Sequence, residues 1–115
     1  MSIRSTIVAA AVIGPWLVPG AAHAASFDCA KAATPTEHAI CDNPQLSSLD
    51  EQTAGLYFTL ISGGAPDATA SVADVKAEQA KFLTKRNACG ANYNCLIGAY
   101  TDQIMYLNAA SGKGM

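Results

Sequence analysis

The fold of this chain is decided by one stretch, Cys41-Asp42-Asn43-Pro44-Gln45-Leu46-Ser47-Ser48-Leu49-Asp50. Asn43 is a favourable N-cap, and Pro44 suits the first helical position because a backbone N–H has no partner there. From this point apolar or uncharged side chains recur every three or four residues, the period of an amphipathic helix. That stripe consists of Leu46, Leu49, Thr53, Leu56 and Leu60. The sequence therefore predicts a helix from Asn43 to about Ile61, with one face packed against partners.

Three further helices are predicted around this one. Thr34-Pro35-Thr36-Glu37 has the pattern of a capping box and predicts a short helix from Pro35 to about Cys41. Residues 62–70 read as a loop, and Ser71 is a favourable N-cap for a helix that runs to about Asn87. A last helix carries apolar residues from Leu96 to Leu107. Because no segment alternates as a strand does, we expect an all-α fold, a small disulfide-linked bundle of one short helix and three longer ones.

Residues 1–24 have the features of a secretory signal. A start with one positive charge, Arg4, is followed by an apolar run over residues 6–18 and by the small-residue exit Ala22-His23-Ala24. The apolar run is shorter than the roughly 20 residues that a membrane helix needs. We therefore expect cleavage after Ala24, a single mature domain over residues 25–115, no membrane span after signal removal, and a periplasmic or secreted location.

The cysteines are expected to form two disulfides. The chain has four, Cys29, Cys41, Cys89 and Cys95, and an even number in a small exported domain is typical of disulfide bonding. Four cysteines allow three connectivities, and the sequence alone does not choose among them. We favour the two local pairs, Cys29 with Cys41 and Cys89 with Cys95, because each would join adjacent elements across a short connection. Zinc is the competing interpretation, but neither spacing resembles C-x2-C.

The charge of the chain limits its partners. The sequence has seven Lys and Arg residues and nine Asp and Glu residues, so loss of Arg4 with the signal leaves six against nine and a formal charge of −3. No basic run occurs, which argues against nucleic acid as a partner. A basic protein partner is compatible with this charge.

Catalytic signatures are absent from the sequence. It contains no Gly-rich phosphate loop, no H-E-x-x-H, no G-x-S-x-G and no C-x-x-C. Asp50 and Glu51 are adjacent, so on a helix they point about 100° apart and cannot converge on one bond. His38 has only Cys41 and Asp42 at the neighbouring helical positions. We therefore predict a protein that is not an enzyme and that needs no metal or cofactor.

A buried polar network is predicted between the second and third helices. Gln79 and Arg86 are seven positions apart, and thus on one helix face, beside the apolar stripe formed by Val75 and Phe82. Asp50 borders the stripe of the main helix and could accept a hydrogen bond from Arg86. We expect Asp50, Gln79 and Arg86 to meet.

The order of these features resembles the LprI-type lysozyme-inhibitor domain of exported bacterial proteins. The matching residues are Phe27-Asp28-Cys29, Thr34 to Cys41 with Glu37 and Ile40, Pro44-x-Leu46-x-x-Leu49-Asp50, Tyr57, Gln79, Phe82-Leu83, Arg86, Cys89, Cys95-Leu96 and Tyr100. They span nearly the whole mature chain. Two positions depart from the family pattern: Phe82 stands where tryptophan is usual, and Gln103 stands where a basic residue is usual.

The resemblance implies an exported binding protein that inhibits lysozyme. The alternative is a structural or interaction module of the cell envelope that makes no contact with lysozyme. The predicted partner contacts are exposed loop and helix-edge residues: Asp42, Asn43, Glu51, Asp67, Asn92, Tyr93 and Asn94. Loops bounded by disulfides would be rigid before binding, which lowers the entropy cost of association.

Overall fold

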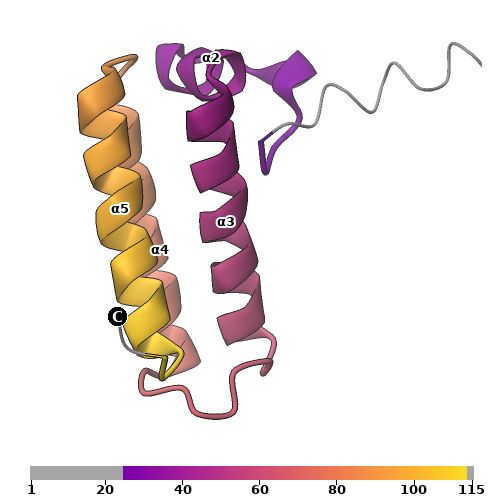
Figure 1. Cartoon of the computed structure of the whole chain (residues 1–115), viewed down its shortest axis with the longest axis vertical. Helices are drawn as coiled ribbons and strands as arrows, with labels where there is room; N and C mark the ends of the chain where they lie inside the picture. The colour runs from indigo at the N-terminus through magenta and orange to yellow at the C-terminus, as the bar shows by residue number, and fades with distance from the viewer. Residues whose placement is uncertain (1–24, 114–115) are drawn as a thin grey trace, which may run out of the picture.

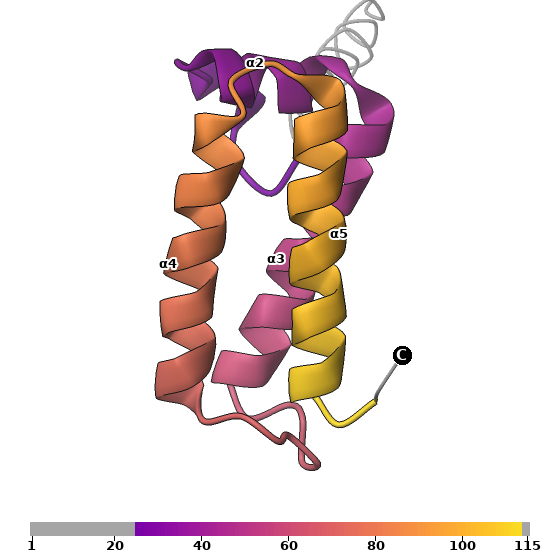
Figure 2. The same cartoon turned by 90° about the vertical axis from the view of Figure 1, so that its left-hand side faces the viewer.

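Three long helices lie side by side, and a short helix lies across one end of them (Figures 1 and 2). This arrangement is seen in a computed structural model that describes residues 25–113, so the predicted signal over residues 1–24 lies outside the described part. The elements in chain order are a 3-10 turn, η2 (Cys29–Lys31), and the helices α2 (Pro35–Asp42), α3 (Pro44–Ile61), α4 (Val72–Ala88) and α5 (Tyr93–Ala110). The predicted all-α bundle of one short and three longer helices is confirmed.

Side-chain caps set where the helices begin. The Asn43 side chain accepts hydrogen bonds from the backbone N–H groups of Gln45 and Leu46, so α3 begins at Pro44 as predicted. Thr34 and Glu37 form the reciprocal capping box at the start of α2. In α5 the cap is Asn92, whose side chain accepts from the N–H of Cys95. These local bonds satisfy donors that the first helical turn leaves without partners.

The core has two parts along the bundle. Near α2, the buried side chains include Ile40, Leu46, Leu96 and Tyr100, with Phe82 packed among them. Toward the other end, a second cluster consists of Leu60, Val75, Leu107 and Ala110. Each long helix contributes to both clusters, because α3, α4 and α5 run the full length of the bundle. The predicted stripe of α3 therefore has the partners that it requires.

Both disulfides lie at the α2 end. Cys29 is bonded to Cys41 and Cys89 to Cys95, which confirms the two local pairs. The first bond fixes η2 to α2, and the second joins the end of α4 to the first turn of α5. A disulfide typically stabilises a fold by about 2 to 4 kcal/mol, and the stabilisation is smaller when the loop that it closes is short.

Two further features of residues 25–113 bear on function. Within that range, no group of three or more His, Cys, Asp and Glu side chains could hold a metal ion. Over the same residues, no helix is both long enough and apolar enough to cross a membrane.

Truncation of the core leucine of α3 should destabilise the domain much more than truncation of a partly exposed leucine. Leu46 is 1% exposed, whereas Leu83 on α4 is 38% exposed. Leu46→Ala is expected to lower the free energy of unfolding by about 2 to 5 kcal/mol, because it leaves a cavity between helices. Leu83→Ala, the control, should cost less than about 1 kcal/mol. Urea unfolding followed by circular dichroism measures both, and equal costs would contradict this packing.

Candidate functional site

The carboxylate of Asp50 is the centre of a buried polar network. Asp50 is 3% exposed and lies on α3, facing the rest of the bundle. Its Oδ1 accepts from the Tyr100 hydroxyl at 2.6 Å and from Arg86 Nη1 at 3.4 Å. Its Oδ2 accepts from the backbone N–H of Ser26 at 2.8 Å and from the Ser26 hydroxyl. Each carboxylate oxygen therefore has two donors.

Arg86 supplies the compensating positive charge. Its side chain is 10% exposed, and its Nη1 forms the ion pair with Asp50. The Nε and Nη2 groups donate to Oδ1 of the neighbouring Asn87 at 3.1 and 2.9 Å. A buried charge is tolerated when it is both paired and hydrogen-bonded, and Arg86 meets both conditions.

Tyr100 completes the network from α5. The residue is fully buried, and its ring packs against Phe82 with the ring centroids 5.3 Å apart. Burial raises the pKa of the Tyr100 hydroxyl well above its usual value, and the hydrogen bond to Asp50 raises it further. The phenol therefore stays protonated and serves as a hydrogen-bond donor that links α5 to α3.

The structure brings together only part of the predicted network. Asp50 and Arg86 meet, but Gln79 lies elsewhere: its Oε1 accepts from Gln103 Nε2 at 2.8 Å. Gln79 and Arg86 lie on the same face of α4 but are seven residues apart, which corresponds to about 10 Å along the helix axis. The two side chains therefore contact different parts of the neighbouring helices. The sequence prediction missed Ser26 and Tyr100. A buried tyrosine needs a hydrogen-bond partner for its hydroxyl. This requirement could have indicated from the sequence that Tyr100 belongs to the network.

The disulfide-bonded end gathers most of the predicted partner contacts. Here α2, the start of α3 and the connection between α4 and α5 lie together (Figure 1). Thr36 Oγ1 on α2 donates to the carbonyls of Asn87 and Gly90, at 3.2 and 2.8 Å. The Tyr93 hydroxyl donates to Gln45 Oε1 at 2.7 Å. These contacts and the two disulfides hold the surface of this end in one conformation.

The seven predicted contact residues do not form a single surface. Asp42, Tyr93 and Asn94 are exposed at the disulfide-bonded end. The side chains of Asn43 and Asn92 lie at the same end but are engaged as helix caps. Glu51 is exposed on the second turn of α3, and Asp67 is exposed in the α3–α4 connection at the opposite end of the bundle. Of the seven, the first three are thus the exposed residues of the disulfide-bonded end that do not cap a helix, and of these the Tyr93 hydroxyl is bonded to Gln45.

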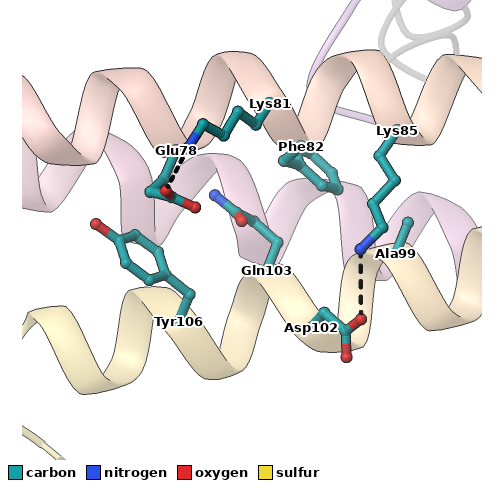
Figure 3. Close-up of a pocket in the computed structure, with 8 residues that line it drawn as sticks. All are labelled: Glu78, Lys81, Phe82, Lys85, Ala99, Asp102, Gln103 and Tyr106. Atoms are coloured by element: carbon teal, nitrogen blue, oxygen red, sulfur yellow. Dashed lines mark hydrogen bonds and ion pairs between the residues drawn. The ribbon is translucent and has the colours of Figure 1, made fainter.

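A groove of about 250 Å³ lies between α4 and α5 (Figure 3). Three of the residues that line it are buried: Phe82, Ala99 and Gln103. Two ion pairs border it: Lys81 with Glu78 at 3.2 Å along α4, and Lys85 with Asp102 at 3.7 Å across the groove. The lining residues are Glu78, Lys81, Phe82, Lys85, Ala99, Asp102, Gln103 and Tyr106.

The groove combines paired charges with hydrogen-bonding groups. Its two lysines and two carboxylates are paired with each other, so its charges balance. Partial burial raises the pKa of Tyr106, and the negative charges of Glu78 and Asp74 act in the same direction. Tyr106 therefore remains a neutral donor beside the groove. No histidine, cysteine or serine belongs to this described lining.

Comparison of the chain with protein-family models, curated proteins and solved structures found no match in any of the three.

Removal of the buried arginine should be far more costly than removal of its surface neighbour. Arg86→Ala leaves the Asp50 carboxylate buried without its counter-charge, which typically costs about 3 to 5 kcal/mol. Lys85→Ala, the matched control, breaks an ion pair whose side chains are 66% and 70% exposed. That change should cost at most about 1 kcal/mol. Chemical unfolding measures both, and an unchanged stability of Arg86→Ala would contradict the network.

The Tyr100 hydroxyl should make the domain sensitive to alkali. Its pKa is higher in the folded than in the unfolded chain. Its contribution to stability is therefore complete below the unfolded pKa of about 10 and is lost as pH rises toward the folded pKa. In that window stability should fall by about 1.4 kcal/mol for each pH unit. Tyr100→Phe should lack this component, whereas Tyr93→Phe at the surface should retain it. Unfolding at pH 9 to 11.5 tests both.

Proposed function

We propose that this protein is an exported, non-catalytic binding protein and that a lysozyme is its partner. Export through residues 1–24 would place it in the periplasm or outside the cell, and its activity would need no cofactor. The sequence resemblance to LprI-type inhibitors supports the choice of lysozyme. The observation that carries the proposal is the rigid, exposed surface at the disulfide-bonded end, where Asp42, Asn94 and the ring of Tyr93 are exposed.

Rigidity is the first property that suits this end to binding. The two disulfides, the Thr36 bonds to the α4–α5 connection and the contact of Tyr93 with Gln45 are all formed within the free protein. A surface ordered in advance loses less conformational entropy when it binds. Tyrosine also suits such a surface, since it provides a large contact area with only two side-chain torsions to fix.

Charge is the second property. Asp42 is exposed at this end, and Glu37 on α2 is partly exposed. Hydrogen bonds from the backbone N–H groups of Ala33 and Thr34 lower the pKa of Glu37, so that it stays ionised in mild acid. A lysozyme has catalytic carboxylates in a cleft, and on a basic member of that class the surrounding surface attracts acidic groups. An inhibitor can thus block the cleft without doing chemistry.

The groove between α4 and α5 favours a second candidate, an envelope interaction module without lysozyme contact. Its charged residues are already paired with each other. A strongly basic partner gains little from such a balanced surface, whereas a neutral partner can hydrogen-bond to it without breaking the pairs. Under this candidate the partner would lie along the side of the bundle shown in Figure 3.

Inhibition assays on several lysozyme types, at low and moderate salt, test the proposal with the oxidised mature protein. Tyr93→Ala is expected to weaken inhibition by at least tenfold, as truncation of a central interface aromatic commonly does. Asp42→Lys should weaken it mainly at low salt, where exposed charges act over longer distances. Asp67→Lys makes the same change of charge at the opposite end and is the control.

The result also distinguishes the two candidates. Equal effects of Asp42→Lys and Asp67→Lys would show that inhibition does not use the disulfide-bonded end. Absence of both inhibition and binding at tens of micromolar, for every lysozyme type, would leave the envelope interaction module as the better proposal.

A further inference from the structure

The groove between α4 and α5 contains a buried hydrogen-bond acceptor that no described residue satisfies. Gln103 is 6% exposed, and its Nε2 donates to Oε1 of Gln79 at 2.8 Å. Among residues 25–113, none donates a hydrogen bond to Oε1 of Gln103 itself. Figure 3 shows the Gln103 amide directed from α5 into the groove, between Phe82 and Glu78. Because buried polar atoms are almost always hydrogen-bonded, this oxygen suits a donor on a ligand.

The neutral groups of the groove are buried, and its charged groups are exposed. The buried floor consists of the Gln103 amide, the Phe82 ring and the Ala99 methyl group. The rim consists of the four side chains of the two ion pairs, which are 40% to 75% exposed. A charged ligand group on the floor would lack a buried counter-charge, which is costly. The floor therefore favours a neutral ligand.

The rim favours hydroxyl groups on that ligand. Nζ of Lys85 and Oδ2 of Asp102 face each other across the groove at 3.7 Å, beyond hydrogen-bond distance. Because both side chains are mostly exposed, they can separate at small cost. A hydroxyl between them accepts from the ammonium group and donates to the carboxylate, so neither charge loses its partner. An amide N–H or a carbonyl can do only one of these.

The size of the groove suits a single ring. Its volume is about 250 Å³. Pockets for drug-sized ligands begin at roughly 300 Å³ and combine apolar walls with a few polar groups. A sugar ring has C–H groups that can contact Phe82 and Ala99, and hydroxyls around its edge that can reach the floor amide and the rim.

We propose that the α4–α5 groove binds one unit of a neutral saccharide. One hydroxyl of the sugar donates to Oε1 of Gln103, and another lies between Lys85 and Asp102. Binding is reversible and includes no covalent step. This site would supply the ligand of the second candidate function, on which it rests, and it needs no lysozyme contact at the disulfide-bonded end.

A titration followed by nuclear magnetic resonance tests the site. Amide signals of the isotope-labelled, oxidised mature protein are recorded while D-glucose or N-acetyl-D-glucosamine is added, with glycine as a zwitterionic comparison. A single ring reaches only millimolar affinity, so each compound is added to about 50 mM. For the sugars, saturable shifts are expected in residues 78–85 and 99–106. Their affinity should change little between about 0.02 and 0.3 M salt, because the ligand is uncharged.

Two variants and a control assign the binding to the groove. Gln103→Leu removes the floor acceptor and should weaken sugar binding at least tenfold, with circular dichroism as the check on folding. Asp102→Ala changes an exposed rim residue, so the fold should persist, and binding should weaken about three- to tenfold. Asp67→Ala removes an exposed carboxylate at the opposite end of the bundle and should leave sugar binding unchanged.

Three results would overturn the proposal: no saturable shifts with either sugar, saturation at residues outside the groove, or an unchanged affinity in both groove variants. Tighter binding of glycine than of both sugars would refute the neutral ligand class. Lysozyme inhibition by the same variants is measured separately. Its absence alongside intact sugar binding would refute only the lysozyme contact, and absence of sugar binding alongside inhibition would refute only the groove site.

Discussion

A single buried negative charge organises this domain. The Asp50 carboxylate is almost fully enclosed, and its donors come from the N-terminal segment, α4 and α5. A buried carboxylate is tolerable only with its hydrogen bonds and counter-charge in place, so the segments that supply them are held in one mutual arrangement. The apolar contacts provide most of the burial, while this network determines which helix faces meet near α2.

The two ends of the bundle are held by different means. At the α2 end, two disulfides and the Asp50 network fix the connections. At the other end, the α3–α4 connection is fixed to the end of α5 by backbone contacts, including Thr69 N–H to the Ala110 carbonyl at 2.7 Å. Gly112 is required there: its φ is 86°, and a Cβ would lie 2.3 Å from the Asp67 carbonyl oxygen. A covalently restrained end and a hydrogen-bonded end thus offer surfaces of different rigidity, and the restrained one suits preorganised binding.

The exposed surfaces of the domain also differ in their chemistry. The rigid end presents an aromatic and acidic surface, whereas the α4–α5 groove presents paired charges around an apolar lining. The residues that contact Asp50 are structural, because Tyr100 and Arg86 are buried and each is engaged with a named partner. The buried network keeps in place the surfaces on which the proposed recognition of a partner would depend.

The sequence by itself predicted the helices and the starting points of α2, α3 and α4, and it favoured the local disulfide pairs without excluding the other connectivities. Those features depend on residues a few positions apart: the Asn43 cap acts within one turn, and Cys89 and Cys95 are only six positions apart. The sequence also predicted that Asp50 meets Arg86, but only the tertiary structure decided that Tyr100 and Ser26 join this pair while Gln79 pairs with Gln103. It also decided that Asp42 and Tyr93 share one end while Asp67 lies at the other. Helical periodicity specifies which face of each helix is buried, but the axial offset between neighbouring helices depends on how their side chains interlock.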